Sequence, residues 1–395
     1  MKILLLSFYY APDLSAGSFR TTSLVKALLE QLPEAAEIDL ITTLPNRYQS
    51  FSSEAPEQEA HDRLKIRRVK LPPHQSGMAD QARAFMAYAK KVLELTREVN
   101  YALVYGTSSR LMTAALSAYV AKKKSAPLYL DIRDIFVDTI KDVLPRNAAF
   151  AARPVFSLLE RWTMKRAAVI NLVSQGFRDY FQTRYPSQKL SFFTNGIDEV
   201  FITAGASPNV YATTDGPARV LYAGNMGEGQ GLHAIVPELA KRLEGKVTFR
   251  LIGDGGRRPQ LEQRMRDLDC TNVELLPPVK RDELLSEYQN ADILFLHLND
   301  YDAFRKVLPS KIFEYAAMGK PVWAGVAGYA AEFLQSEVDN AAVFSPCDVD
   351  DAVREFESLK LCDVKRTQFI RKYARENIMR DMAADILKLL PVEGR

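Results

Sequence analysis

The chain has 395 residues, of which 47% are hydrophobic and 26% charged, and its net charge is +3. This length favours two domains, each with enough apolar material for its own core, and the small net charge gives no reason to expect a nucleic-acid partner. The three cysteines and four histidines lack the spacing of metal ligands. We therefore expect reduced thiols, a cytoplasmic protein, and neither a metal nor another cofactor.

In the first half, short apolar runs alternate with longer helix-patterned runs, which predicts parallel strands joined by crossover helices. The opening run ends too soon, at Pro12, to be a signal peptide, so we expect a buried strand there. No stretch approaches the ~18 consecutive apolar residues of a membrane span. The predicted strands are Ile3–Phe8, Ile38–Thr42, Ile66–Val69, Leu103–Tyr105, Leu128–Asp131 and Val169–Val173. The predicted helices are Phe19–Leu32, Asp80–Val99, Ser109–Lys124 and Ala152–Arg166.

The second half restarts the same alternation, which predicts a second parallel sheet. Its predicted strands are Arg219–Ala223, Thr248–Ile252, Val273–Leu275, Ile293–Leu296, Val322–Ala324 and Ala342–Phe344. Its predicted helices are Leu232–Leu243, Arg257–Leu268, Arg281–Asn290, Pro309–Met318, Tyr329–Gln335 and Asp348–Ser358. A long amphipathic helical run, Val364–Leu390, ends the pattern.

The fold class predicted from this alternation is α/β, with two Rossmann-like, doubly wound parallel-sheet domains that face a cleft. Residues 205–217 have the composition of a turn-rich linker. The first domain is then residues 1–204, the second is 218–363, and the tail is 364–395. Because ligands of open parallel sheets bind at the carboxyl ends of the strands, the binding residues are expected directly after strands.

Two segments of the first half follow strands and carry polar residues. Asp13–Arg20 combines small residues with a guanidinium, and its glycine, Gly17, lets a ligand approach the backbone and the free N–H groups of the next helix. The alternative is a plain strand-to-helix turn. Leu130–Phe136 carries two carboxylates and a guanidinium at the end of a strand, and a carboxylate there could act on an acceptor hydroxyl. The alternative is a structural ion pair between Arg133 and Asp134.

Three loops of the second half also follow strands. Gly224–Gly231 is rich in glycine and suits a loop that cradles phosphates, although its spacing is not that of the dinucleotide fingerprint. Gly253–Arg257 is a shorter glycine turn, and Pro277–Leu284 could present backbone groups to a nucleobase. For each loop the alternative is a connection without a ligand.

The most informative segment is Leu308–Val322, which predicts a short helix with a carboxylate, Glu314, among apolar residues. The start of such a helix attracts a diphosphate, and a carboxylate one turn further along can accept hydrogen bonds from sugar hydroxyls. The alternative is a helix packed on a sheet, with Glu314 in a local ion pair.

A further segment, residues 146–166, interleaves aromatic and aliphatic residues with arginine and lysine. A basic amphipathic helix that contains a tryptophan can lie on an anionic membrane surface, although most such helices simply pack on a protein core. Lys122–Lys124 would add positive charge to the same surface.

Taken together, these segments resemble the bacterial family 4 glycosyltransferases of the GT-B fold, in the branch that assembles O-antigen, capsule and other surface polysaccharides. The order and spacing of the matching pieces over most of the chain support the resemblance. The matching pieces are Tyr9–Pro12, Ser15–Arg20, Arg133–Phe136, Tyr222–Gly227, Gln230–Leu232, Ile252–Gly255, Pro309–Tyr315 and Gly319–Pro321.

The resemblance implies retaining transfer from a nucleotide-diphosphate sugar, with UDP as the expected nucleotide and without a metal. It assigns Glu314 to the donor ribose, Gly17 to the donor phosphates, and the last helix to a return to the first domain. The catalytic residues expected are Asp134, Arg133, Lys306 and Glu314. The donor-binding residues expected are Gly17, Arg20, Gly224, Asn225, Gly227, Gln230, Gly253, Asp254, Lys280, Arg305, Val307, Leu308, Lys311 and Glu314.

The chain departs from the family pattern in three places. Lys306 stands where the family has a second glutamate, and Gln230 stands where a basic residue is common. Charge for the diphosphate would then come from Arg305, Lys306 or Lys311. Arg133 and Asp134 stand where a histidine is often found.

We expect front-face attack, in which the leaving phosphate takes the proton of the acceptor and Asp134 orients the acceptor hydroxyl. The expected acceptor is a polyprenyl-diphosphate-linked sugar or a glycan at the inner face of the cytoplasmic membrane, where the protein would be peripheral. Two alternatives are a sugar-nucleotide epimerase of the same fold and a non-catalytic nucleotide-sugar binding protein.

Overall fold

The structure is a computed structural model of the whole chain. It describes all residues except 14, 46–54, 73–77, 109–110, 136, 138–145, 206–215 and 392–395, and it describes only the backbone at 78–79 and 146–151. Most of the linker expected at 205–217 therefore lies outside the described residues.

The chain forms two compact units. Unit 1 combines Met1–Asn195 with Arg375–Arg395, and unit 2 is Gly196–Ala374. We expected the first domain to extend to residue 204 and the tail to begin at residue 364. The boundaries of the two units instead follow residues 195 and 374.

Unit 1 is built on an eight-stranded sheet in the order β3-β4-β2-β1-β5-β6-β7-β8. All described neighbours in it pair in parallel except β3 and β4. The central strands are buried on both faces, as crossover topology requires. The strands are β1 (Lys2–Leu6), β2 (Glu37–Thr43), β3 (Gln58–His61), β4 (Leu64–Val69), β5 (Leu103–Thr107), β6 (Leu128–Ile132), β7 (Val169–Leu172) and β8 (Lys189–Ser191).

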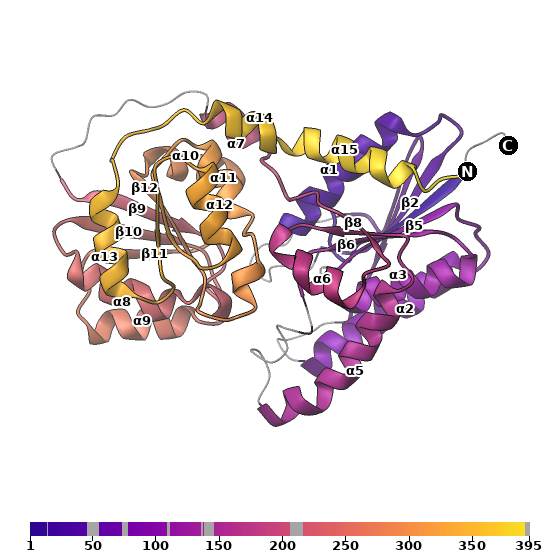
Figure 1. Ribbon diagram of the computed structural model, residues 1–395, viewed down its shortest axis with the longest axis horizontal. Helices are drawn as coiled ribbons and strands as arrows, with labels where there is room; N and C mark the ends of the chain where they lie inside the picture. The colour runs from indigo at the N-terminus through magenta and orange to yellow at the C-terminus, as the bar shows by residue number, and fades with distance from the viewer. Residues whose placement is uncertain are drawn as a thin grey trace. The chain divides into compact units, whose positions relative to one another are not determined.

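The helices of unit 1 cover both faces of this sheet (Figure 1). On one face, α1 packs with α15, and their apolar side chains form a core with the sheet residues Ile3, Leu5 and Leu40. On the other face lie α2 and α3, and Tyr88 of α2 donates to the carbonyl of Ile41 at 2.8 Å. The helices are α1 (Ala16–Gln31), α2 (Met78–Thr96), α3 (Leu111–Lys124), α5 (Arg146–Met164), α6 (Arg178–Arg184) and α15 (Arg375–Leu387).

Unit 2 is built on a six-stranded parallel sheet in the order β11-β10-β9-β12-β13-β14. The order reverses between β9 and β12, which is the point where ligands bind in sheets of this kind. The strands are β9 (Ala218–Ala223), β10 (Val247–Ile252), β11 (Val273–Leu276), β12 (Ile293–His297), β13 (Val322–Gly325) and β14 (Ala341–Phe344).

Two apolar clusters, one on each face, hold the helices of unit 2 to this sheet. One cluster joins α11, α12 and α14 to residues such as Leu221 and Leu294, and the other joins α8 and α13 to Val220 and Trp323. The helices are α7 (Glu199–Gly205), α8 (Leu232–Arg242), α9 (Arg258–Asp267), α10 (Arg281–Asn290), α11 (Lys311–Ala317), α12 (Tyr329–Glu337), α13 (Val349–Ser358) and α14 (Thr367–Tyr373).

The structure differs from the sequence-based elements mainly where the hydrophobic pattern is weak. Strand β3 carries mostly exposed polar side chains, because it lies at the edge of the sheet, and we did not predict it. The helical tail is divided rather than continuous. Ala374 adopts an extended ψ of 122°, so α14 stays in unit 2 while α15 packs on unit 1.

Candidate active site

The predicted donor-binding residues of the second half all lie in unit 2, on segments that follow the carboxyl ends of its strands. Gly224, Asn225, Gly227 and Gln230 follow β9. The others are Gly253 and Asp254 after β10, Lys280 after β11, and Arg305, Val307, Leu308, Lys311 and Glu314 after β12. The parallel topology therefore brings these loops to one edge of this sheet.

Close backbone packing explains two of the glycines at this edge. Gly253 has a φ of 146°, and a Cβ there would collide with the carbonyl of Gly224. Gly224 itself has a φ of 154°, and its N–H donates to the carbonyl of Ile252 at 2.8 Å. The two turns thus support each other, and only glycine fits at these positions.

Side-chain amides close the loop that follows β9. Asn225 Nδ2 donates to Gln230 Oε1 at 2.7 Å, and the N–H of Gly227 donates to the same oxygen at 3.3 Å. Tyr222 is buried, and its hydroxyl donates to the carbonyl of Asn225 at 2.6 Å. These neutral groups hold part of the loop, and Glu228 in the same loop pairs with Arg257 and accepts from the hydroxyl of Tyr301. None of these loop residues contributes a positive charge.

Lys311 supplies positive charge beside this loop. Its Nζ lies 2.6 Å from the position that a Cβ on Gly224 would occupy, and 5.9 Å from the centre of the Tyr222 ring. Its ammonium has no ion-pair partner among the residues that the structure describes. Burial lowers the pKa of Lys311, and the nearby Glu314 opposes this shift. Because α11 has only seven residues, the ammonium matters more here than the helix dipole.

Glu314 lies one turn along α11, and its side chain is half-buried. The buried hydroxyl of Tyr288 donates to Glu314 Oε2 at 3.2 Å. A carboxylate has acceptor positions for more than this one bond. Glu314 can thus still receive hydrogen bonds from a ligand, and the local ion pair considered as an alternative is not present among the described residues.

The other cations that we expected near a diphosphate occupy different settings. Arg305 is exposed and pairs with Asp300 at 3.2 Å. Lys306 is half-buried, and Lys280 is exposed at the start of α10. Asp254 is exposed, and its carboxylate accepts from the N–H of Gly255 at 2.7 Å. None of these four residues lies against the glycine loop in the way that Lys311 does.

His297 supports the same loop and was missed in the sequence analysis. It is fully buried, its Nδ1 donates to the carbonyl of Gln230 at 2.7 Å, and its Nε2 accepts from the N–H of Cys347 at 3.0 Å. These roles require the neutral ring, and burial lowers its pKa to about 4. A histidine at the end of an apolar strand was the only available signal, and it does not distinguish a support residue from any other buried histidine.

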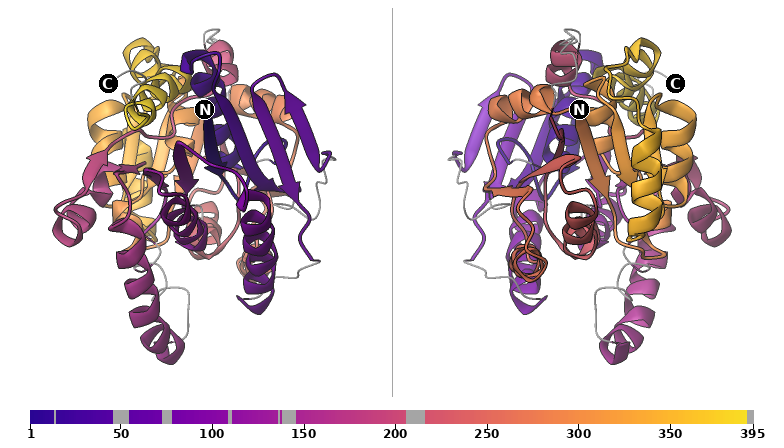
Figure 2. Two further views of the ribbon diagram at one scale, coloured as in Figure 1. Left: turned by 90° about the vertical axis from the view of Figure 1, so that its right-hand side faces the viewer. Right: turned by 90° about the vertical axis from the view of Figure 1, so that its left-hand side faces the viewer.

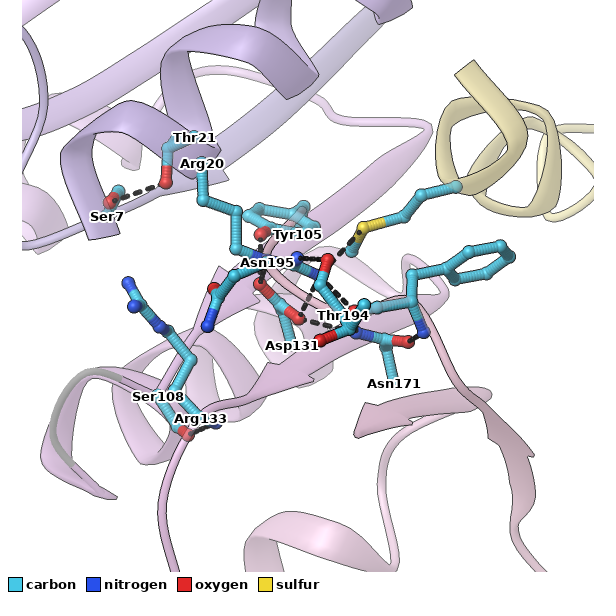
Figure 3. A network of polar contacts seen from close by, with 12 residues as sticks. Ser7, Arg20, Thr21, Tyr105, Ser108, Asp131, Arg133, Asn171, Thr194 and Asn195 are labelled. Atoms are coloured by element: carbon cyan, nitrogen blue, oxygen red, sulfur yellow. Dashed lines mark hydrogen bonds and ion pairs between the residues drawn. The ribbon is translucent and has the colours of Figure 1, made fainter. Parts of the chain in front are cut away.

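In unit 1, Arg20 lies at the centre of a buried network (Figure 3). Its Nε and Nη2 donate to the two oxygens of Asp131 at 2.8 and 3.0 Å, and it also donates to the carbonyls of Phe193 and Thr194. Tyr105 and Asn171 donate to the same carboxylate at 3.0 and 2.7 Å. Burial raises the pKa of Asp131, but the Arg20 guanidinium more than offsets this effect and holds that pKa below its ordinary value.

This network assigns Arg20 to the scaffold of unit 1. Its side chain is 0% exposed, so it is not available to a ligand at the surface. We expected Arg20 to contact the donor, and this expectation is not supported by its position. A bidentate buried arginine joins residues that are 111 positions apart, which a sequence pattern does not reveal.

The other predicted residues of unit 1 lie near this network. Gly17 is the second residue of α1, and a Cβ on it would collide with Nη1 of Arg133. Asp134 follows β6 and is exposed. The structural ion pair between Arg133 and Asp134 that we considered is not formed among the described residues.

Two sequence profiles of known families match the chain one after the other. The profile described as glycosyl transferase 4-like domain matches residues 21–196, and the profile described as glycosyl transferases group 1 matches residues 206–377. Together they cover most of the chain. A putative colanic acid biosynthesis glycosyl transferase of Escherichia coli, WcaI, is 27% identical over 175 residues, which is 42% of each protein.

Solved structures share the fold over nearly the full length. A sucrose-phosphate synthase from Thermosynechococcus elongatus has a TM-score of 0.73 and 14% identity, with 98% of each chain covered. The Anabaena protein HepE, solved in complex with UDP, has a TM-score of 0.65 and 16% identity, with 98% of this chain and 100% of that chain covered. At these identities the similarity establishes the fold alone.

The described residues contain neither a membrane-spanning helix nor a cluster of metal ligands. No helix among them has the length and apolar character that a crossing of a membrane requires. No group of three or more histidine, cysteine or acidic side chains in the same part of the chain is arranged to hold a metal ion. Transfer without a metal stays a prediction.

Proposed function

From the premise that the chain belongs to the family 4 glycosyltransferases, we propose that it is a retaining enzyme of the surface-polysaccharide branch and that it uses a UDP-linked sugar. The observation that carries the proposal is the edge of the unit 2 sheet, where α11 brings the Lys311 ammonium, which has no ion-pair partner among the described residues, and the available carboxylate of Glu314 beside a glycine loop. Loops of this kind bind the phosphates of a nucleotide through backbone N–H groups. UDP is supported by the Anabaena relative that was solved with it.

Each group has a definite role in this proposal. Glu314 accepts hydrogen bonds from the ribose hydroxyls, while the hydroxyl of Tyr288 holds the carboxylate in place. Lys311 stabilises the charge that collects on the diphosphate as the bond to the sugar breaks, because it is already in position and needs little reorganisation. Asn225 and Gln230 shape the loop rather than neutralise the phosphates.

We propose no nucleophile on the protein, so the acceptor hydroxyl itself makes the attack. The acceptor hydroxyl attacks the anomeric carbon on the face from which the diphosphate leaves, and a leaving phosphate oxygen takes the proton of that hydroxyl. The configuration at the anomeric carbon is thereby retained. We propose that unit 1 binds the acceptor and that Asp134, which is exposed after β6, orients its hydroxyl.

The acceptor is proposed to be a polyprenyl-diphosphate-linked sugar or a glycan, and α5 is proposed to hold the protein at the inner face of the cytoplasmic membrane. The first half of α5 projects from the sheet of unit 1, as Figures 1 and 2 show. Val155 and Leu158 are 65% and 69% exposed, and they lie on the side of the helix opposite the buried Glu160. Two exposed basic residues follow them, Arg161 in the last turn of α5 and Lys165 directly after the helix, and exposed apolar residues beside basic ones are typical of a helix that lies on an anionic membrane.

Vesicle binding tests the role of α5. We expect the protein to sediment with vesicles that contain anionic lipid, and the variant with Val155→Ser and Leu158→Ser to remain largely in solution. A matched control replaces Met86, which is 65% exposed on α2, with serine and should bind as the unchanged protein does. Equal binding of both variants would show that α5 does not anchor the protein.

A substrate screen tests the activity itself. Thermal-shift measurements with UDP, GDP and ADP identify the nucleotide, because a ligand of the native state raises the melting temperature. Transfer is then assayed with the UDP-sugars and a polyprenyl-diphosphate-linked acceptor. Epimerisation of a UDP-sugar without acceptor would favour the epimerase, and binding without turnover across an acceptor screen would favour a binding protein.

A further inference from the structure

Glu228 places a negative charge in the glycine loop that we assign to the phosphates of the donor. It begins the short 3-10 helix η2 (Glu228–Gln230), which follows β9. The hydroxyl of Tyr301 and the guanidinium of Arg257 lower the pKa of Glu228, so the carboxylate is ionised at neutral pH. Because like charges repel, an anion in a phosphate-binding loop is unfavourable unless it is itself neutralised and serves another purpose.

This carboxylate joins three of the loops that follow strands in unit 2. One of its oxygens, Oε2, accepts from Nε of Arg257 after β10, and the other, Oε1, accepts from the hydroxyl of Tyr301 after β12. The side chains of Arg257 and Glu228 are 39% and 41% exposed, and an ion pair this accessible to water adds little to the free energy of unfolding. The purpose of Glu228 therefore lies in the geometry of the loops rather than in stability.

The segment after β12 packs on the glycine loop over several residues. Asn299 Nδ2 donates to the carbonyl of Glu228 at 3.1 Å, and the N–H of Asn299 donates to the carbonyl of Gly229 at 2.9 Å. The ring of Phe304 covers the same glycine, since its Cζ lies 3.0 Å from the position that a Cβ on Gly229 would occupy. A side chain at residue 229 would press against this ring, so the two segments are packed as one structure.

Tyr301 connects Glu228 to a turn that carries basic residues. The carbonyl of Tyr301 accepts from the N–H of Phe304 at 2.9 Å, and the centres of their rings are 5.5 Å apart. Phe304 begins the 3-10 helix η3 (Phe304–Lys306). The side chain of Tyr301 thus holds Glu228 while its main chain holds the start of η3, so loss of the hydroxyl bond would allow η3 to shift against the glycine loop.

We propose that Glu228 is a positioning residue, which acts through Tyr301 to hold Lys306 at the donor site. Lys306 is the last residue of η3, and its side chain is half-buried. As the bond between the sugar and the diphosphate breaks, Lys306 adds a second cation to that of Lys311 and stabilises the charge that collects on the leaving phosphates. Arg257 neutralises Glu228, so the carboxylate guides this segment without opposing the diphosphate. The assignment rests on the proposed function, because it concerns the same donor site and the same transfer.

Three variants test the assignment by steady-state transfer from a UDP-sugar to a polyprenyl-diphosphate-linked sugar. Tyr301→Phe removes only the hydroxyl, and Glu228→Gln removes the charge that receives its hydrogen bond. The control is Glu274→Gln, because Glu274 is also an exposed carboxylate of unit 2 that pairs with an arginine, Arg250. We expect kcat to fall about tenfold in the first two variants, because a cation out of position stabilises the leaving group less, and to stay unchanged in the control. An unchanged kcat in Tyr301→Phe would overturn the proposal.

A double-mutant cycle shows whether the effect passes through Lys306. The variant Lys306→Met removes the ammonium and keeps an unbranched side chain. If Tyr301 acts through that ammonium, the variant with both Tyr301→Phe and Lys306→Met has the kcat of Lys306→Met alone. A hydroxyl that only stabilised the fold would instead lower kcat by the same factor in both backgrounds, and this result would overturn the proposal.

Hydrogen exchange tests the link between Glu228 and η3 without any substrate. The N–H of Phe304 should exchange faster in Tyr301→Phe and Glu228→Gln than in the unchanged protein, whereas Glu274→Gln should leave its rate unchanged. Unchanged exchange in the first two variants would overturn the proposal whatever the activity. Faster exchange in a protein without transferase activity would support the link and refute the proposed function.

Discussion

The two sheets end differently at their carboxyl edges. In unit 1, the polar residues after the strands mostly bind one another, and Arg20 and Asp131 are fully buried in a network that leaves neither available. In unit 2, the polar residues lie on glycine loops, where Lys311 is unpaired and Glu314 has one hydrogen-bond donor among the described residues. Residues with similar chemistry thus serve stability in one unit and are available to a ligand in the other.

The comparison shows that the chemical type of a residue after a strand does not decide its role. The decisive feature is whether other groups of the protein form hydrogen bonds or ion pairs with the side chain. Arg20 and Arg133 lie in the same region of unit 1, yet among the described residues only Arg20 has acceptors for its guanidinium.

The largest effect is expected from Asp131→Ala, which leaves the Arg20 guanidinium buried without its carboxylate. Such a change costs about 3–5 kcal/mol, a large part of the ~5–15 kcal/mol that stabilises a typical protein. Urea denaturation measures the loss. The double variant Arg20→Met with Asp131→Leu removes both charges and should recover most of the stability. If Asp131→Ala were as stable as the unchanged protein, the network would not be the scaffold of unit 1.

The next effect concerns pH and the loop support in unit 2. The pKa of His297 is lowered from 6.5 to about 4 in the folded protein, so the unfolded chain binds more protons between these values. Stability therefore rises with pH through this window and is complete above it, and the contribution amounts to as much as ~3 kcal/mol. Denaturation from pH 4 to 7 measures the slope, which should be shallower in His297→Gln. An identical slope in the variant would argue against a neutral buried histidine.

A smaller effect is expected from Glu314→Gln, which keeps an oxygen for Tyr288 but removes the charge. Because hydrogen bonds to charged groups contribute roughly 1.5–3 kcal/mol, kcat/KM should fall about 10- to 100-fold with the melting temperature nearly unchanged. Steady-state kinetics and thermal unfolding measure the two quantities. A large loss of stability with ordinary kinetics would instead place Glu314 with the scaffold residues.

The sequence predicted the parts of this contrast that depend on local pattern. Apolar runs located the buried strands of both sheets, and glycine clusters located the loops after β9 and β10. The parallel topology then placed the candidate residues of each sheet at its carboxyl edge. These predictions succeed because a buried parallel strand and a glycine turn each have a composition of their own.

Partners that are distant in the chain could not be predicted. Arg20 was expected at the donor because nothing in its neighbourhood reveals Asp131, and His297 was overlooked because its partners Gln230 and Cys347 lie on other loops. The division of the tail at Ala374 depends on packing against two different units rather than on helix propensity. Each of these features is decided by tertiary contacts.

The measurement that tests the central claim most directly compares UDP with UMP by isothermal titration, in the unchanged protein and in Lys311→Gln. The two nucleotides differ by the phosphate that we assign to Lys311. We predict that the variant binds UDP about tenfold or more weakly while its affinity for UMP is unchanged, because only the diphosphate reaches the ammonium. Equal affinities for UDP in the two proteins, or an equal loss for both nucleotides, would contradict the account.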